Sequence, residues 1–250
     1  MPPIIKRYPT LHSTNSEALS LGDDAPHGFV VWAVEQTAGR GQRGNTWEAA
    51  PGCNATFSLV LRPGDFPPAR QFELSMAVSL AITSVLDELL AGAGKRSCVK
   101  WPNDIYVDDR KICGILIENS ITPSRISRMV VGVGLNINQT LFVSDAPNPV
   151  SLAMLTGLPC DVGEVVERVS SQILTMVEGY VSSPLPDDIH ARYMRSLWRN
   201  DGSMHTWRDA ADGSLFRAAV ADVGVDGMLT LAADDGRRRS FAFKEVAAVL

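Results

Sequence analysis

Residues 36–47 of this 250-residue chain read Gln-Thr-Ala-Gly-Arg-Gly-Gln-Arg-Gly-Asn-Thr-Trp, with three glycines, two arginines and no acidic residue. Glycine lets a backbone adopt positive φ and approach a ligand closely. Free backbone N–H groups beside guanidinium groups suit a phosphate or a carboxylate. The stretch is neither a Walker loop, since no Gly-Lys-Ser/Thr follows, nor a dinucleotide fingerprint. Taken alone, it fits a mobile surface loop rich in glycine and arginine equally well.

A second group of residues that could do chemistry lies at positions 99–118. We expect a hairpin with strands at 99–107 and 111–118. Pro102 predicts a bend at Asn103-Asp104, because proline interrupts strand hydrogen bonding. Lys111 opens a strongly apolar strand, where a charge is costly unless an anion meets it. The alternative is a lysine whose charged end reaches solvent at the strand edge.

Residues 128–138 are predicted to form a core strand with an unusual content of glycine and asparagine. Gly132 and Gly134 indicate that another group approaches this backbone closely. Asn136 and Asn138 alternate with apolar residues and are expected to share one face. Since asparagine is depleted in strands, the pair suggests a polar task such as holding a hydrated metal ion or a phosphate.

The elements that must position these residues follow from periodicity and turn residues. Ser13-Thr14-Asn15 begin a helix, for which capping is the simpler explanation and binding of a small polar ligand the alternative. Residues 69–90 carry an apolar stripe at helical spacing and form the clearest helix. Beyond residue 202, short strands separated by Asp-Gly turns predict a compact β module of about 50 residues. Further strands are expected at 4–8, 29–35 and 54–61, and further helices at 151–155, 162–181 and 189–198.

The composition excludes several classes of protein. A hydrophobic fraction of 45% with 20% charged residues describes a globular protein with a real core. A net charge of −5 argues against a general nucleic-acid binder, so any cationic site must be local. The four cysteines are scattered without a C-x-x-C pair, which predicts buried, reduced thiols. With no secretory signal and no apolar run that approaches membrane-spanning length, we expect a soluble cytoplasmic protein.

Four segments together, by their order and spacing, resemble biotin protein ligase (biotin–[acetyl-CoA-carboxylase] ligase). They are Gly39-Arg40-Gly41-Gln42-Arg43-Gly44 with Trp47, Lys100-Trp101-Pro102-Asn103-Asp104, Lys111-Ile112-Cys113-Gly114-Ile115-Leu116, and Gly132-Val133-Gly134-Leu135-Asn136-Ile137-Asn138. The resemblance covers essentially the whole chain. It implies an α+β fold of the class II synthetase-like type, in which residues 1–200 form a catalytic biotin- and ATP-binding domain with a mixed sheet backed by helices. Residues 201–250 would form a small SH3-like β-barrel.

The resemblance also implies the reaction. Biotin is activated by ATP and Mg²⁺ as biotinyl-5′-AMP and is then transferred to a lysine on the biotin carboxyl carrier protein domain of a carboxylase. Such chemistry needs positioning and charge stabilisation more than a protein nucleophile. Because the intermediate is readily hydrolysed, a closing loop must exclude water.

Position by position, the resemblance assigns roles to residues of this sequence. The biotin-binding residues would be Ser13, Thr14, Asn15, Gln36, Gly39, Arg40, Gly41, Lys111, Gly114 and Gly132. The ATP side would comprise Arg40, Arg43, Trp47, Asn103, Asp104, Lys111 and Asn136, with Asn103, Asp104 and Asn136 holding Mg²⁺ directly or through water. Lys111, bridging the biotin carboxylate and the α-phosphate, and Arg40 are the catalytic candidates. Lys100 is interpreted as structural or phosphate-facing.

This chain departs from the family pattern at two positions of the glycine-rich loop. Gln42 stands where many members carry arginine, and Asn45 where a basic residue is common. In the family pattern that arginine helps to retain the adenylate. Since Gln42 brings no charge, we expect retention to depend more on Arg40 and Arg43.

Other interpretations stay open beside this one. A lipoate ligase or octanoyl transferase shares the fold type, and a non-catalytic biotin or nucleotide sensor would be expected to have lost Lys111, Arg40 or Asn136. Residues 1–12 are too few for the helix-turn-helix that makes some family members repressors, so we expect no nucleic-acid partner and no membrane partner. The carboxylase that is modified, and the choice between monomer and homodimer, are undetermined.

Overall fold

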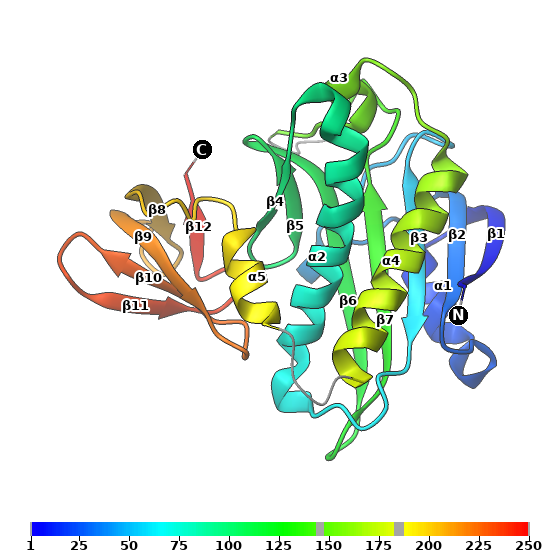
Figure 1. Cartoon of the computed structure of the whole chain (residues 1–250), viewed down its shortest axis with the longest axis horizontal. Helices are drawn as coiled ribbons and strands as arrows, with labels where there is room; N and C mark the ends of the chain where they lie inside the picture. Colours follow the sequence, from blue (N-terminus) through cyan, green and yellow to red (C-terminus); the bar gives the residue numbers. More distant parts are fainter. Residues whose placement is uncertain (1, 144–147, 183–187, 250) are drawn as a thin grey trace.

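A seven-stranded mixed sheet organises most of the chain (Figure 1). The computed structural model describes residues 2–143, 148–182 and 188–249, apart from the side chain of Arg43. The sheet has the order β1-β2-β3-β7-β6-β5-β4, with β1 parallel to β2 and the other neighbours antiparallel. Its strands are β1 (Ile4–Leu11), β2 (Phe29–Gln36), β3 (Ala55–Leu61), β4 (Ser97–Lys100), β5 (Asp104–Val107), β6 (Arg110–Ile121) and β7 (Ile126–Leu135).

Helices cover both faces of this sheet. Two long helices, α2 (Gln71–Leu90) and α4 (Val162–Ser182), enclose the larger core on one face, while α1 (Thr14–Ser20) covers a smaller apolar cluster on the other (Figure 1). Every residue of β3 is buried, because a central strand between two helical layers has no solvent face. The shorter helices are α3 (Leu152–Thr156) and α5 (Ile189–Arg195), with 3₁₀ turns η1 (Gly22–Asp24), η2 (Gln42–Gly44), η3 (Pro68–Arg70) and η4 (Ala91–Ala93).

The C-terminal residues form a second sheet of five antiparallel strands in the order β11-β10-β9-β8-β12. They are β8 (His205–Asp209), β9 (Leu215–Val223), β10 (Leu229–Ala233), β11 (Arg238–Phe241) and β12 (Val246–Ala248). The turns that join β9, β10 and β11 contain Gly227 and Gly236 at φ 85° and 80°, which only glycine adopts easily. This sheet lies beside α5 and the β4–β5 turn (Figure 1), where the indole N–H of Trp101 donates to the Gly227 carbonyl at 3.0 Å.

The structure confirms the expected α+β architecture, a mixed sheet backed by helices with a separate C-terminal β sheet. Three details differ from the sequence prediction. The strand expected at 99–107 is two strands, β4 and β5, that turn back on each other around a cis Trp101–Pro102 peptide. The strand expected at 128–138 ends at Leu135. Strands β8 and β12 were not predicted, because both are short and carry few β-branched residues, although the turn from β8 to β9 does contain Asp212-Gly213.

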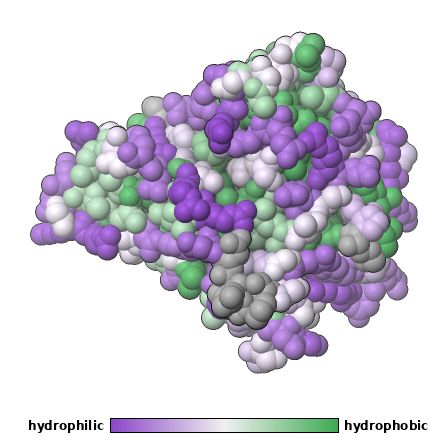
Figure 2. Space-filling model, viewed as in Figure 1, coloured by the Kyte–Doolittle hydropathy of each residue, from purple (hydrophilic) through white to green (hydrophobic). Residues whose placement is uncertain are grey.

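One segment corrects the expectation about membrane-spanning length. Residues Pro68–Ala93, which include α2, are long and apolar enough to cross a membrane by length and composition. Two thirds of the most apolar window, 67%, is buried inside the protein. The face of the molecule that carries α2 and α4 is largely hydrophilic, with smaller apolar areas (Figure 2). The apolar character of α2 is therefore explained by its place in the core.

Two tyrosines that differ in hydrogen bonding give a test of this core. Tyr193 of α5 is fully buried, and its hydroxyl has no partner among the described residues. Tyr180 of α4 donates to the Glu73 carboxylate and accepts from Arg70 at 3.0 Å. An unpaired buried hydroxyl carries an uncompensated desolvation cost, whereas a paired one stabilises.

We predict that Tyr193→Phe raises the free energy of unfolding by about 1 kcal/mol, because it removes a buried hydroxyl without a partner. Tyr180→Phe, the same chemical change, should lower it by about 1–2 kcal/mol, since Glu73 loses a donor. Denaturant unfolding of both variants measures the difference. A loss of stability in Tyr193→Phe as large as in Tyr180→Phe would show that the Tyr193 hydroxyl does have a partner.

Candidate active site

A large cavity of about 1060 Å³ lies between the middle of the seven-stranded sheet and the C-terminal sheet. Twelve residues with predicted roles line it: Ser13, Thr14, Asn15, Gln36, Arg40, Gly41, Trp47, Asn103, Asp104, Lys111, Gly114 and Gly132. Gly39 and Asn136 are not among the lining residues, and the side chain of Arg43 lies outside the described part of the chain. The structure thus brings segments from four parts of the sequence to one place.

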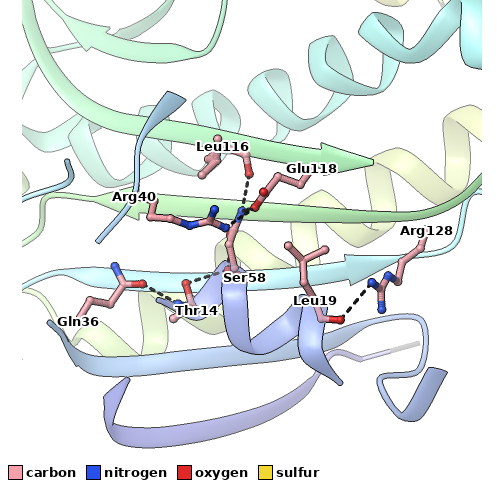
Figure 3. A network of polar contacts seen from close by, with 9 residues as sticks. Thr14, Leu19, Gln36, Arg40, Ser58, Leu116, Glu118 and Arg128 are labelled. Carbon is pink, nitrogen blue, oxygen red and sulfur yellow. Dashed lines mark hydrogen bonds and ion pairs between the residues drawn. The ribbon is translucent and has the colours of Figure 1, made fainter. Parts of the chain in front are cut away.

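One end of the cavity is a closely packed polar pocket at the start of α1 (Figure 3). Thr14 and Asn15 are 4% and 3% exposed. The Thr14 backbone N–H donates to Gln36 Oε1 at 2.7 Å. The Ser58 hydroxyl of β3 lies within hydrogen-bonding distance of both Thr14 Oγ1, at 2.8 Å, and Asn15 Oδ1, at 2.5 Å. Ser13 precedes the helix but accepts no capping hydrogen bond with its side chain. Hydrogen bonds with Gln36 and Ser58, and not helix capping alone, therefore position these polar groups.

Ser58 is not among the site residues predicted from the sequence. The only sequence signal for it is a pair of hydroxyl residues, Thr56 and Ser58, inside the otherwise apolar run of β3.

Glycines on β6 and β7 form the floor of the cavity. Gly132 lies directly under the Asn15 amide, and a Cβ at this position would overlap Asn15 Oδ1. Gly114 and Gly134 are register partners across the two strands. The Trp47 indole lies on both, so a Cβ at Gly134 would overlap the ring and one at Gly114 would lie 3.0 Å from Trp47 Cζ3. The close approach predicted from these glycines is confirmed, and the groups that approach are side chains of the protein itself.

The glycine-rich loop is folded back on itself over this floor. The Trp47 N–H donates to the Gly39 carbonyl at 3.0 Å and the Gly41 N–H to the Asn45 carbonyl at 2.7 Å. An isolated β-bridge joins Arg40 to Thr46 between these two contacts. At the tip, Gly44 has φ 85°. The loop is therefore a small hairpin that places Arg40 at the rim of the cavity.

Lys111 lies beside a carboxylate inside the cavity. Its Nζ is 2.7 Å from Asp104 Oδ1, and the two side chains are only 30% and 19% exposed. The ammonium group is also 5.7 Å from the centre of the Trp47 ring, within cation–π range. Asn103, before Asp104, is held by its side-chain N–H₂, which donates to the Ile115 carbonyl at 2.6 Å. Lys111 is thus a positioned cation, and not a lysine extended into solvent.

Lys100 is a second cation in this part of the cavity. Its Nζ lies 5.1 Å from the Tyr106 ring centre and 5.9 Å from that of Trp198. Burial lowers the pKa of Lys100, and the neighbouring Asp104 opposes that shift. Together with Arg40, Lys111 and Lys244, it gives the described part of the cavity lining four cations against the carboxylate of Asp104. In a chain of net charge −5, this local excess favours an anionic ligand.

The two asparagines of the predicted Gly-Asn strand do not share a face of β7. Both lie beyond Leu135, where the strand ends, so the prediction that they alternate within it is wrong. The side-chain N–H₂ of Asn136 donates to the Val150 carbonyl at 3.1 Å, and that of Asn138 donates to the Cys160 carbonyl at 2.8 Å. Both side chains therefore stabilise the backbone of the segment that follows β7. Beyond Leu135 the backbone makes other pairs: the Asn136 N–H donates to the Ile112 carbonyl of β6, and the Asn138 N–H donates to the Cys53 carbonyl, before β3.

The C-terminal sheet supplies a wall of the cavity that sequence analysis did not anticipate. Trp207, Phe243 and Lys244 are lining residues, and the Phe243 ring packs edge-on against Trp101 at 6.2 Å. No local sequence signal predicts this wall, since it depends on how the two sheets meet.

The cysteines carry no site. All four are free thiols, and burial raises the pKa of Cys98 to about 12 and that of Cys113 further still. The expectation of reduced cysteines is confirmed, although only Cys113 is fully buried. Among the described residues no group of three or more His, Cys, Asp or Glu side chains could hold a metal ion by itself.

We predict that Gly134→Ala displaces Trp47 from the floor of the cavity, because the new Cβ would overlap the indole ring. Hydrogen exchange of the 39–47 amides should then become faster in the ligand-free protein, with little change in the overall unfolding midpoint. Gly92→Ala is the control, since its Cβ would meet no atom within 4 Å. Unchanged exchange in Gly134→Ala would mean that Trp47 does not depend on this glycine.

Comparison with known proteins gives a consistent result. Residues 8–136 match the model of the "Biotin/lipoate A/B protein ligase family". The chain is 33% identical over 162 residues to the bifunctional ligase/repressor BirA of Bacillus subtilis (64% of this chain, 48% of that protein). It is 37% identical over 163 residues to the biotin–[acetyl-CoA-carboxylase] ligase of Paracoccus denitrificans (63% and 66%). The chain therefore spans between about half and two thirds of the length of these relatives.

The fold agrees with this match. The solved structure of biotin protein ligase from Aquifex aeolicus, in complex with biotin and ATP, superimposes with a TM-score of 0.79 at 20% identity, over 98% of each chain. The Leishmania major enzyme in complex with biotinyl-5-AMP gives a TM-score of 0.65 at 20% identity, over 97% of this chain and 100% of that one. At this identity the likeness establishes the fold. Since the family model spans more than half of the sequence, this chain belongs to the biotin/lipoate A/B protein ligase family.

Proposed function

We propose that this protein is an ATP-dependent biotin protein ligase. It would activate biotin as biotinyl-5′-AMP and transfer the biotinyl group to a specific lysine of a biotin carboxyl carrier protein domain. The observation that carries this proposal is the meeting of a buried polar pocket, Arg40 and Lys111 in one cavity. The names of the relatives, among them biotin–[acetyl-CoA-carboxylase] ligase, favour biotin as the acid.

The polar pocket suits the ureido ring of biotin, which has two N–H donors and a carbonyl acceptor. Thr14 and Asn15 present hydroxyl and amide groups that their neighbours hold in place. Gly132 removes the side chain that would otherwise fill the floor below them. Binding a polar ring in such a buried pocket is specific, because a ligand without matching groups leaves buried polar atoms unpaired.

The first chemical step joins two anions. A carboxylate oxygen of biotin attacks the α-phosphorus of ATP, and the bond to pyrophosphate breaks. Fixed cations lower the barrier most when they are already positioned where charge develops. Lys111 meets this condition, since Asp104 holds its ammonium group at 2.7 Å within the cavity. Arg40 would supply the second cation from the loop.

Mg²⁺ would neutralise phosphate oxygens in this step. It commonly binds through one or two carboxylate ligands, with phosphates and water completing the octahedron. Asp104 fits that requirement, and the Asn103 side chain, which uses its N–H₂ on the Ile115 carbonyl, leaves its oxygen for the ion. The role of Asn136 rests on the family resemblance alone, since its side chain does not line the cavity.

The second step is attack of a carrier lysine amine on the acyl carbon of the adenylate, which releases AMP. The glycine-rich loop would keep water from the mixed anhydride until the carrier arrives. We assign residues 1–200 to the catalytic domain and residues 201–250 to an SH3-like domain that completes the cavity wall. A cytoplasmic location fits the need for ATP.

Two alternatives are weaker. A lipoate or octanoate ligase would have no use for the buried polar pocket around Thr14 and Asn15, because an aliphatic chain offers it no hydrogen bonds. A non-catalytic sensor would not need Lys111 placed beside a carboxylate in the cavity.

We predict that Lys111→Ala reduces pyrophosphate release with ATP, Mg²⁺ and biotin by about 10²–10³-fold, the size of effect seen when one charge-stabilising donor is lost. Lys95→Ala, which removes an exposed lysine paired with Asp108 outside the cavity, should leave the rate unchanged. Biotin, lipoate and octanoate are to be assayed separately. Release with lipoate or octanoate alone would assign a different acid, and binding of biotin without release would favour the sensor.

We also predict that Gln42→Arg slows the escape of biotinyl-5′-AMP. Gln42 lines the cavity, and an arginine there would add a charged contact to the phosphate. The measurement is the dissociation rate of preformed adenylate in the absence of a carrier. The difference in dissociation rate between Gln42→Arg and the unmodified protein should become smaller at 1 M salt, where charges are screened within about 3 Å. An off-rate equal to that of the unmodified protein contradicts the prediction.

A further inference from the structure

Glu118 joins two parts of the cavity that the sequence places far apart. It lies on β6, two residues beyond Leu116, and belongs to none of the four segments that carry the family resemblance. Its Oε2 accepts a hydrogen bond from Arg40 Nη2 at 2.8 Å and one from Asn15 Nδ2, also at 2.8 Å (Figure 3). One carboxylate oxygen thus connects the glycine-rich loop with the polar pocket.

For the loop, Glu118 is a tether at Arg40, just beyond the stem. Thr37 and Ala38 form the stem of the loop and are held by backbone hydrogen bonds. The Thr37 N–H donates to the Leu11 carbonyl and the Ala38 N–H to the His12 carbonyl, both at 2.9 Å. Beyond the stem, the backbone hydrogen bonds described above run within the loop itself, and the Trp47 indole packs on Gly114 and Gly134. Among the described residues, the ion pair with Glu118 is the one charged contact that Arg40 makes to the body of the protein.

For the polar pocket, Glu118 sets the orientation of an amide. A carboxylate can only accept hydrogen bonds, so the N–H₂ end of Asn15 must face it. The Leu116 carbonyl, 3.2 Å from the same nitrogen, reinforces this choice. Asn15 Oδ1 then faces Ser58, where it also remains able to accept a hydrogen bond from a ligand. With a neutral amide in place of Glu118, this constraint is weaker.

We propose that Glu118 is a positioning residue that, through Arg40, favours the folded conformation of the glycine-rich loop over open ones, and couples that conformation to the orientation of Asn15. A tether that favours the folded loop reduces the binding free energy that a ligand must use to order it. The pair is partly exposed, with side chains 43% and 31% accessible, so its contribution is modest. Exposed ion pairs of this kind correspond to a change in equilibrium of at most about fivefold.

Hydrogen exchange of the ligand-free protein tests the tether directly. In Glu118→Gln, the amides of residues 39–47 should exchange about two- to fivefold faster, while those of β2 are unchanged. Arg40→Gln should give the same increase, and the double variant no further one, because both substitutions remove one contact. Glu88→Gln is the matched control, since it removes a similar Arg–Glu pair, with Arg168 at 2.6 Å, outside the cavity. Loop exchange in Glu118→Gln equal to that of Glu88→Gln would overturn the proposal.

The effect on ligand binding rests on the proposed function and is measured separately. The dissociation constant of biotin should rise about two- to fivefold in Glu118→Gln, with the turnover at saturating substrate little changed, because the substitution affects ordering and not the reacting atoms. Glu118→Asp keeps the charge on a shorter side chain. Its dissociation constant for biotin should lie between those of the unmodified protein and Glu118→Gln. If the unmodified protein bound no biotin while loop exchange still rose in Glu118→Gln, the proposed function would fail and the tether would stand. Biotin binding with unchanged loop exchange in Glu118→Gln would overturn the tether and leave the proposed function standing.

Discussion

The antiparallel pairing of β6 with β7 is the interaction on which the site depends. Its register sets Leu116 opposite Gly132 and Gly114 opposite Gly134, so that a strip of sheet with three glycines, and with Leu116 as its one side chain, opens in the middle of the fold. Asn15 and Trp47, from segments that precede both strands, lie directly on this strip. A slip of one residue would turn branched apolar side chains into the same space, because side chains alternate between the faces of a strand. The bare floor and the polar pocket above it are therefore a consequence of one strand register.

Two cations at the cavity have carboxylate partners. Lys111 is paired with Asp104 inside the cavity, and Arg40 with Glu118 beside it. A partner lowers the cost of keeping a charge partly buried and fixes its position. It also means that an anionic ligand competes with a carboxylate for the same cation, so affinity depends on how well the ligand matches the geometry. Such an arrangement suits a site that must bind an acid, activate it and release the product.

The cavity also explains why the C-terminal sheet is attached to this fold. The Trp101 indole links the β4–β5 turn to Gly227, and Trp207, Phe243 and Lys244 complete the wall. Aromatic groups at a junction between two sheets exclude water while they leave a polar edge for specific contacts.

Local sequence predicts most of the elements in their order, the helix of α2, the glycine-rich loop and the bend at Pro102, because periodicity, glycine and proline act over a few neighbouring residues. Lys111 also stands out locally, as a charge at the start of an apolar strand, whereas the expected places of Asp104, Thr14 and Asn15 at the site followed from the family resemblance. Tertiary structure alone decided that Ser58, Glu118 and Lys244 belong with these residues, since each is an ordinary residue on its own strand or turn. It also placed Asn136 outside the cavity, because the end of β7 depends on loops that pair with it from elsewhere in the chain. Contacts between residues far apart in the chain follow from strand register and sheet packing, and local sequence carries no signal for them.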